Sequence, residues 1–241
     1  MYDLLRSQFQ KIIDEHELRN EHVRVTVKSP FEAIGTPKRE DFPLVNGKER
    51  IVEASFRNSS GQAFTDAYAS FDGTLREILD LELTNNESRT IFVATMNAVM
   101  KYLRMIEGTT HCKDEEPERC SNELADHVSR NFGDPKIVVI GYQPSIVENL
   151  SKRFAIQVTD LNAENIGGTK SGVKILDGDT EMEQAVQWCD PVPATGSTVV
   201  NGTIERILKA AKEKPLIFYG ITLVGPAELL GLNRFCITMC K

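Results

Sequence analysis

A run of neutral polar side chains lies in the second half of the chain, where Thr195, Ser197, Thr198, Asn201 and Thr203 fall within nine residues. Residues 195–204 carry no charge and include two glycines. Hydroxyl and amide groups at the start of a helix can hold an anion or a polar ligand. The segment fits neither a nucleophile elbow, which needs glycines at 195 and 199, nor a Walker loop, which needs a lysine. We favour a ligand pocket; the alternative is a turn with Asn201 as a helix cap.

A second candidate group consists of His111, Cys112 and Cys120, which lie within ten residues of one another. Imidazole and thiolate are the ligands that zinc and softer transition metals take in proteins. The segment around them is expected to be a loop, which leaves the side chains free to converge. One hypothesis is therefore a site for a divalent transition metal, and the other is a set of buried, unreactive thiols.

The composition is that of an ordinary globular protein, with 41% apolar and 26% charged residues among 241. The net charge is -7 and the 28 Lys and Arg residues are scattered, which argues against a nucleic-acid partner. No run of 18 apolar residues occurs, and the amphipathic first 20 residues lack the pattern of a signal peptide. We therefore expect a cytoplasmic protein without a membrane partner, with its five cysteines reduced.

The first half of the chain predicts a small α+β unit. A helix is expected over residues 2–19, and a long helix opens at Thr84 and closes at Gly108. Apolar residues cover most of this second helix and predict packing on more than one side, leaving a narrow polar stripe of Thr90, Asn97, Lys101 and Arg104. Between the two helices we expect a strand over 22–29, a proline-broken surface loop over 30–44, and a hairpin of strands 50–57 and 62–67 with its turn at 58–61.

From Pro135 onward, short apolar runs alternate with helical patterns, which predicts a parallel, doubly wound sheet. The expected strands span residues 136–142, 155–160, 189–196, 215–222 and 234–240. Prolines at 191 and 193 indicate that the third of these is short or lies at an edge. In such sheets ligands bind beyond the carboxyl ends of the strands, so the loops to consider are 141–144, 160–168, 195–201 and 220–226.

The first of these loops bears on a nucleotide cofactor. Its sequence GYQPSIV has one glycine where the dinucleotide fingerprint has three. Asp160, however, follows Gly141 by 19 residues at the end of the second strand, where an acid can bind ribose hydroxyls. A nucleotide- or dinucleotide-dependent enzyme therefore remains an alternative, and the competing interpretation is that Asp160 begins a turn or caps a helix.

Several motifs spread over nearly the whole chain resemble one family. They are GQAFTDAYASFDGTL (61–75), ATMNAVMKYL (94–103), GTTHC (108–112), PERCSNEL (117–124), IGYQPSIVE (140–148), VTDLNAENIGG (158–168), ATGSTVVNGTI (194–204) and FYGITLVGPAELLGLNRFC (218–236). They are similar to the bacterial and archaeal proteins described as "putative heavy-metal chelation" proteins. The resemblance implies an enolase amino-terminal-like α+β domain, here 1–108, and a Rossmann-like α/β domain, here 109–241 with a connecting segment 109–134. It also implies a site in the cleft between them.

The motifs of this family carry over to two sets of residues at the implied cleft. The first domain contributes Gln62, Phe64, Thr65 and Asp66, and the second contributes Gln143, Pro144, Asp160, Asn165, Thr195, Gly196, Ser197, Asn201 and Thr222. Asp66 and Asp160 are then the expected catalytic or metal-facing groups, because carboxylates buried at a cleft tend to have perturbed pKa values. Asn97 also falls in a motif, but on the polar stripe of its helix, where it could simply face water.

Three functional hypotheses follow. The first is a site at the domain junction for a small polar or anionic molecule, with or without a divalent transition metal. The second is a metal-sequestering protein that uses His111, Cys112 and Cys120 with oxygen ligands from Asp66 or Asp160. The third is a ligand sensor or scaffold without turnover. A homo-oligomer is compatible with each of them.

Overall fold

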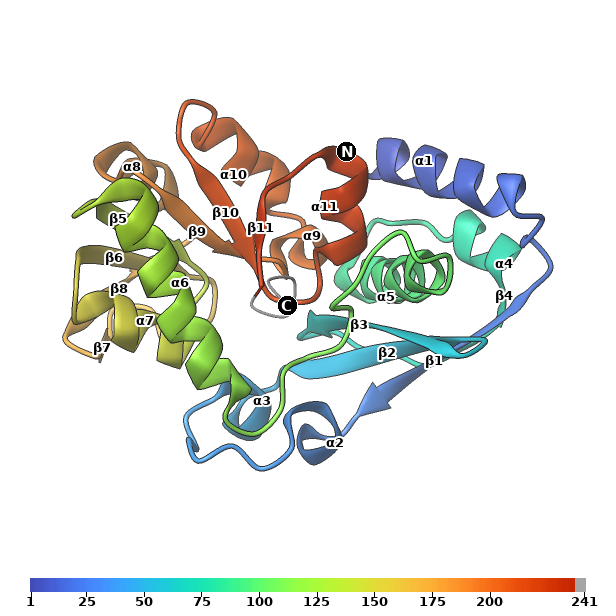
Figure 1. Ribbon diagram of the computed structural model, residues 1–241, viewed down its shortest axis with the longest axis horizontal. Helices are drawn as coiled ribbons and strands as arrows, with labels where there is room; N and C mark the ends of the chain where they lie inside the picture. Colours follow the sequence, from blue (N-terminus) through green and yellow to red (C-terminus); the bar gives the residue numbers. More distant parts are fainter. Residues whose placement is uncertain (237–241) are drawn as a thin grey trace.

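Two β-sheets lie side by side in the computed structural model, and helices pack on both (Figure 1). The structure describes residues 1–236, apart from the side chain of Asn46. Within them, one sheet has the strand order β3-β2-β1-β4 and the other has the order β11-β10-β9-β5-β6-β8-β7. The expected mixed α/β fold with one mostly parallel sheet is confirmed. Among the described helices, none combines the length and the hydropathy that crossing a bilayer requires.

The first sheet is antiparallel. Its strands are β1 (His22–Lys28), β2 (Arg50–Phe56), β3 (Ser59–Thr65) and β4 (Phe71–Thr74). The β2–β3 hairpin turns at Arg57, earlier than expected, because Arg57 takes the positive φ of 51° that a two-residue turn demands. Strand β4 and the helix after it, α4 (Leu75–Asp80), were not expected from the sequence.

Segment 30–44 is not simply a loop, since it contains α2 (Pro30–Ile34) and the first half of α3 (Pro43–Asn46). Each helix begins with proline, whose missing N–H costs nothing at a first helical position. Ser29 and Glu32 add a capping box to α2. The prolines that indicated a broken loop therefore start helices.

Helix α5 (Asn86–Tyr102) runs along the first sheet and also contacts the helices of the second (Figure 1). Its cap is Asn85 and it ends at Tyr102, so it is shorter at both ends than expected. Every residue from Thr90 to Met100 is buried. Packing on more than one side is confirmed, but the predicted polar stripe is wrong at Thr90 and Asn97, which are both fully buried.

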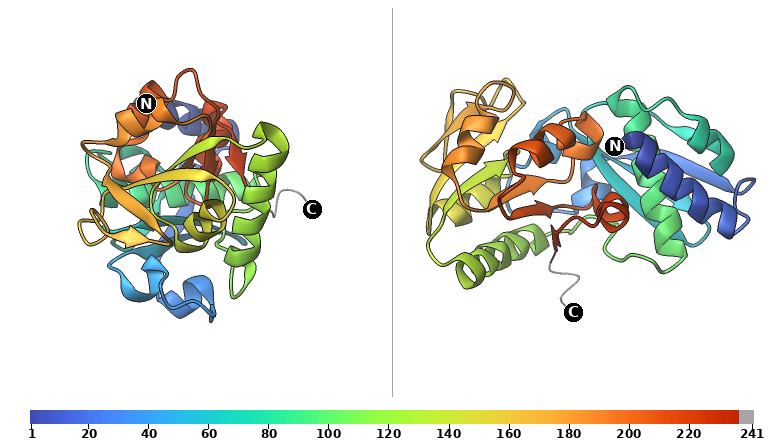
Figure 2. Two further views of the ribbon diagram at one scale, coloured as in Figure 1. Left: turned by 90° about the vertical axis from the view of Figure 1, so that its left-hand side faces the viewer. Right: turned by 90° about the horizontal axis from the view of Figure 1, so that it is seen from above.

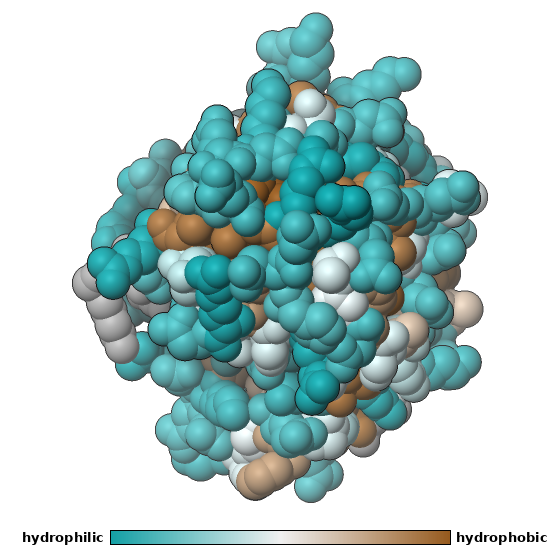
Figure 3. Space-filling view, turned by 90° about the vertical axis from the view of Figure 1, so that its right-hand side faces the viewer, coloured by the Kyte–Doolittle hydropathy of each residue, from teal (hydrophilic) through white to brown (hydrophobic). Residues whose placement is uncertain are grey.

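Helix α1 (Tyr2–Glu15) completes the first unit. Figure 2 shows it lying alongside α5, and the Phe9 and Phe92 rings meet edge to face at 5.6 Å between centroids. The surface at this end of the molecule is mostly hydrophilic with a narrow apolar strip (Figure 3). The apolar stripe predicted for residues 2–19 is thus mostly turned inward, through Leu5, Phe9, Ile12 and Ile13, but Leu4 is exposed and the helix ends at Glu15.

The second sheet is parallel except where β7 (Thr169–Lys170) pairs antiparallel with β8 (Val173–Asp177). Its other strands are β5 (Lys136–Ile140), β6 (Ala155–Asp160), β9 (Val192–Thr195), β10 (Leu216–Tyr219) and β11 (Arg234–Phe235). Strands β7 and β8 were not expected from the sequence. Strand β11 covers only residues 234 and 235 of the predicted strand 234–240, and residues 237–240 of that prediction lie outside the described part of the chain.

Helices cover both faces of this sheet. Helices α6 (Glu116–Phe132) and α7 (Pro144–Ser151) pack on the face that carries Ile137 and Val139 of β5. Val138 and Ile140 face the other side, where the core is continuous with that of the first sheet. This second face is covered by α8 (Met182–Trp188), α9 (Thr198–Asn201), α10 (Ile204–Ala210) and α11 (Val224–Leu230).

Strand β9 is short as predicted, but it is not an edge strand, since it lies between β10 and β5. Pro193 has no N–H to donate, and the register between β5 and β9 is one residue pair, Ile140 with Ala194. The chain leaves β5 toward β6 and β8 on one side, and β9 leads to β10 and β11 on the other. The strand order therefore reverses between β5 and β9, which is where ligands bind in sheets of this kind.

Candidate functional site

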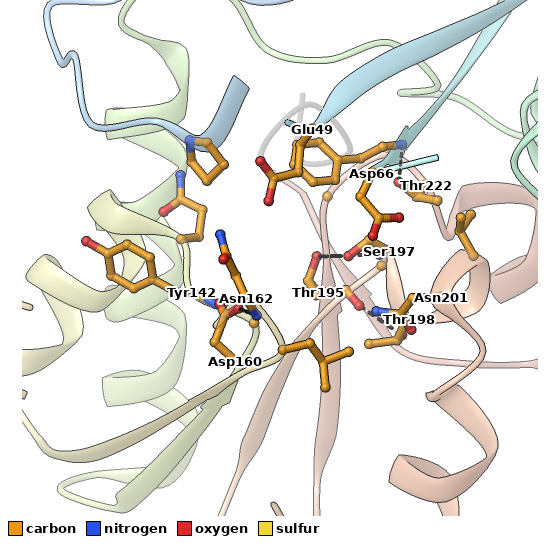
Figure 4. Close-up of a pocket in the computed structure, with 18 of the residues that line it drawn as sticks. Glu49, Asp66, Tyr142, Asp160, Asn162, Thr195, Ser197, Thr198, Asn201 and Thr222 are labelled. Atoms are coloured by element: carbon orange, nitrogen blue, oxygen red, sulfur yellow. Dashed lines mark hydrogen bonds between the residues drawn. The ribbon is translucent and has the colours of Figure 1, made fainter. Parts of the chain in front are cut away.

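A cavity of about 630 Å³ lies at this reversal point, between the carboxyl edge of the second sheet and the end of the first (Figure 4). Asp160 and Thr195 are the last residues of β6 and β9, and both line the cavity. The first sheet contributes Glu49, directly before β2, and Asp66, directly after β3. The predicted junction of the two units is therefore a recess with walls from both.

Hydrogen bonds hold the two walls together. The backbone N–H of Phe64 on β3 donates to the Thr222 hydroxyl at 2.9 Å. Asn97 on α5 donates to the carbonyls of Gln62, Ile221 and Thr222. Asn97 does not line the cavity, so its place in a family motif reflects a structural contact rather than solvent exposure or a ligand contact.

The neutral polar segment forms one wall. The hydroxyls of Thr195 and Ser197 lie 3.0 Å apart, and that of Thr198 donates to the Thr195 carbonyl at 2.9 Å. The Asn201 side-chain oxygen accepts from the backbone N–H and the hydroxyl of Thr203. All five side chains line the cavity, so the segment is both a self-bonded turn and a polar surface of the recess.

Asp160 is held by the backbone. One of its carboxylate oxygens accepts from Tyr142 N–H and the other from Asn162 N–H, each at 2.6 Å. Burial raises the pKa of Asp160, although these N–H bonds act against the shift. The carboxylate thus occupies the Tyr142 N–H after β5 and the Asn162 N–H after β6, and Gln143 caps α7 through Ile146 N–H, so these donors are not free for a pyrophosphate. This arrangement disfavours the dinucleotide alternative.

Glu49 is a cavity residue that the sequence did not reveal. Its Oε2 atom is inaccessible to solvent and has no hydrogen-bond partner among the described residues. Burial raises the pKa of Glu49 against the opposing effect of a hydrogen bond to its own backbone, and the charges of Asp160, Asp66 and Glu164 raise it further. No motif or spacing in the sequence marks Glu49. It lies directly before β2, and it meets the other acids of the cavity only when the chain folds.

Cys112 and Cys120 lie near enough to affect each other's charge, but the three predicted metal ligands do not share the cavity. His111 lines the cavity but Cys112 and Cys120 do not. Burial lowers the pKa of His111, and burial together with the neighbouring Cys120 and Cys236 raises that of the Cys112 thiol to about 12, although a bound metal would itself deprotonate a coordinating thiol. Within residues 1–236, no group of three or more His, Cys, Asp and Glu side chains is arranged to hold a metal ion. The hypothesis of a transition-metal site at His111, Cys112 and Cys120 therefore has no preformed ligand group to support it among the described residues.

The other predicted site residues fall into two groups, those that line the cavity and those that do not. The cavity is lined by Phe64, Thr65, Asp66, Gln143, Asp160, Asn165, Thr195, Gly196, Ser197, Thr198, Asn201, Thr203 and Thr222. Gln62 does not line it, because its amide is engaged with Glu53 and with the His111 backbone. Pro144 is the buried first residue of α7 and also lies outside the lining.

An α/β protein with a recess at the reversal of its parallel sheet is thus the class that the fold and the cavity define. Residues 123–232 match the family model described as "Putative heavy-metal chelation", DUF364. The family resemblance drawn from the sequence motifs is therefore confirmed. No curated protein matches the chain.

Two solved structures of DUF364 proteins of unknown function share the fold. One, from Pyrococcus horikoshii, is 22% identical with a TM-score of 0.53, and the match covers 90% of this chain and 79% of that one. The other, from Desulfitobacterium hafniense, is 15% identical with a TM-score of 0.51, over 75% of this chain and 72% of that one. At these identities the likeness concerns the fold alone.

Proposed function

We propose that the protein binds a small polar metabolite in the cavity between its two sheets. The observation that supports this most is the cavity itself, whose volume of about 630 Å³ is that of a typical small-molecule site. In this proposal residues 1–108 are an enolase amino-terminal-like domain that covers a Rossmann-like domain, 109–241, joined through 109–134.

The lining supplies both specificity and exclusion of water. Hydroxyl and amide groups of Thr195, Ser197, Thr198 and Asn201 form the polar wall described above. Apolar side chains including Ile34, Phe42, Leu44 and Phe64 line the same recess. A polar wall beside apolar ones orients a ligand through a few hydrogen bonds and shields them from water.

Binding is the function that the geometry supports best. Both Asp160 oxygens accept backbone N–H groups, so this carboxylate acts as an oriented negative charge that is not free to swing toward a ligand. Asp66 is exposed, its Oδ1 accepts from the Asn86 amide at 3.1 Å, and it lines the recess. A heavy metal forms no part of the proposal, because the candidate thiol and imidazole ligands do not converge.

The proposal is tested by closing the cavity. Ala163 is exposed and lines the recess, so Ala163→Trp fills it without disturbing the core. Ala155 is also exposed, but it is the first residue of β6, whereas the cavity lies at the last. Ala155→Trp is therefore the matched control. We expect thermal-shift screening of a metabolite collection to find a compound that stabilises the wild type and the control but not Ala163→Trp. The proposal fails if every stabilising compound acts equally on both variants, or if none stabilises the wild type.

A further inference from the structure

The charges around the cavity are unequal. Four acids line it, namely Glu49, Asp66, Asp160 and Glu164, against the two cations Lys48 and Arg206. The Arg206 guanidinium donates to both carboxylate oxygens of Glu183, which lies outside the lining, and is neutralised there. Burial lowers the pKa of His111, which favours its neutral form. Lys48 is exposed, as are Asp66 and Glu164, and the recess is negative because its acids outnumber its cations.

Two buried polar atoms in this recess have no partner among the described residues. The Thr159 side chain lines the cavity and is 1% exposed, yet its hydroxyl makes no hydrogen bond. The Oε2 atom of Glu49 is in the same condition. A buried polar atom without a partner is destabilising, and native proteins keep few of them. These atoms mark places where a polar group of a ligand would be bound.

We infer that the ligand carries a positively charged amino group, which binds between Glu49, Asp66 and Asp160; this inference rests on the proposed function. Figure 4 shows the Glu49 and Asp66 carboxylates entering the recess from the first sheet, across from Asp160. An ammonium group has three donors and no acceptor, and an ionised carboxylate only accepts. Hydrogen bonds between such charged groups are among the strong ones in proteins.

Other charged ligands fit less well. An anion in this position would face four carboxylates, and the backbone N–H groups of Tyr142 and Asn162 that could have offset them already bind Asp160. A bare metal ion needs three or more ligand atoms converging on one point, and the described part of the chain has no such group. An ammonium group needs fewer ligand atoms than a metal ion, because charge-assisted hydrogen bonds of about 2.7–2.9 Å to one or two carboxylates suffice to bind it.

The test uses three four-carbon probes with different end groups: putrescine with ammonium, succinate with carboxylate, and butanediol with hydroxyl. Calorimetry at low ionic strength measures the Kd of each for the wild type. We expect putrescine to bind and succinate not to. Glu49→Gln is expected to weaken putrescine at least tenfold, and Asp66→Asn, on an exposed side chain that folding does not need, is expected to weaken it as well.

Glu213→Gln is the control for net charge, because Glu213 is exposed and lies outside the lining. It should leave the Kd of putrescine unchanged. The inference is overturned if succinate binds more tightly than putrescine, if putrescine fails to bind at millimolar concentration, or if Glu49→Gln and Glu213→Gln behave alike. It is also overturned if Zn²⁺ alone stabilises the wild type and not Glu49→Gln. None of these outcomes contradicts the proposal that the cavity binds a small molecule. That proposal fails separately, if no compound distinguishes Ala163→Trp from Ala155→Trp.

Discussion

Asn97 accepts a hydrogen bond at 2.7 Å from the backbone N–H of Gly225, a residue 128 positions further along the chain. The same amide donates to Gln62 O at 3.0 Å and to Ile221 O and Thr222 O at 3.3 Å. One fully buried side chain on α5 thus joins strand β3 of the first sheet to the loop and helix that follow β10. The position of one cavity wall relative to the other depends on this contact.

Asn97→Ala is therefore expected to destabilise the protein. It removes four hydrogen bonds and leaves the Gly225 N–H buried without its acceptor. Losses of this kind cost about 2–4 kcal/mol in the free energy of unfolding. Urea denaturation measures the loss, with Asn122→Ala on the exposed face of α6 as the matched control. Equal stability of the two variants would show that the contact does not hold the units together.

Gly61 marks the closest approach of β3 to α5. A Cβ at this position would lie 2.2 Å from the Ala98 backbone nitrogen and 2.5 Å from the Ala94 carbonyl oxygen. Backbone atoms cannot move aside as a flexible side chain can, so Gly61→Ala must push the strand off the helix. We expect a loss of about 2 kcal/mol or more in the free energy of unfolding. Ser60→Ala at the next position should cost much less, and a Gly61→Ala variant as stable as Ser60→Ala would contradict the observed packing.

The ionised Glu49 side chain is expected to strengthen ligand binding in the cavity and to lower the free energy of unfolding. Its pKa is raised in the folded protein, so ionisation opposes folding. The penalty is absent below the unfolded pKa of about 4.3 and grows as the pH rises through the folded pKa. Glu49→Gln should therefore raise the Tm of the ligand-free protein at pH 7, and this gain should disappear near pH 4. Differential scanning calorimetry across this range measures it; a lower Tm at pH 7 would indicate that Glu49 makes a stabilising bond.

Cys112 is expected to react slowly. Burial, reinforced by nearby thiols, raises the pKa of Cys112 to about 12, and the thiolate is the reactive species. At pH 8 its alkylation by iodoacetamide, followed by mass spectrometry, should be far slower than that of a cysteine in the urea-unfolded chain. Treatment with EDTA should leave the Tm unchanged. A fall in Tm after EDTA that Cys112→Ser abolishes would restore the metal hypothesis.

Several features of the candidate site could be predicted because they depend on local sequence. Parallel strands put their carboxyl ends at one edge, so the loops after residues 140, 160 and 195 could be placed together without a structure. The hydroxyls between Thr195 and Thr203 line the recess for the same reason. Local patterns failed where prolines have two meanings: Pro30 and Pro43 begin helices, and Pro193 lies in an interior strand.

The order of strands and helices along the chain follows from hydrophobic periodicity and turn residues, which act over a few positions and are therefore readable from the amino-acid order. The burial of Asn97 and the turning of Glu49 toward Asp160 depend on residues more than a hundred positions apart. Such contacts arise only when the two sheets pack. Sequence thus specified the neutral wall of the cavity and, through the family motifs, the acids Asp66 and Asp160 beside it. Tertiary packing alone added Glu49, because no local pattern connects this acid with Asp160, which lies more than a hundred positions further along the chain.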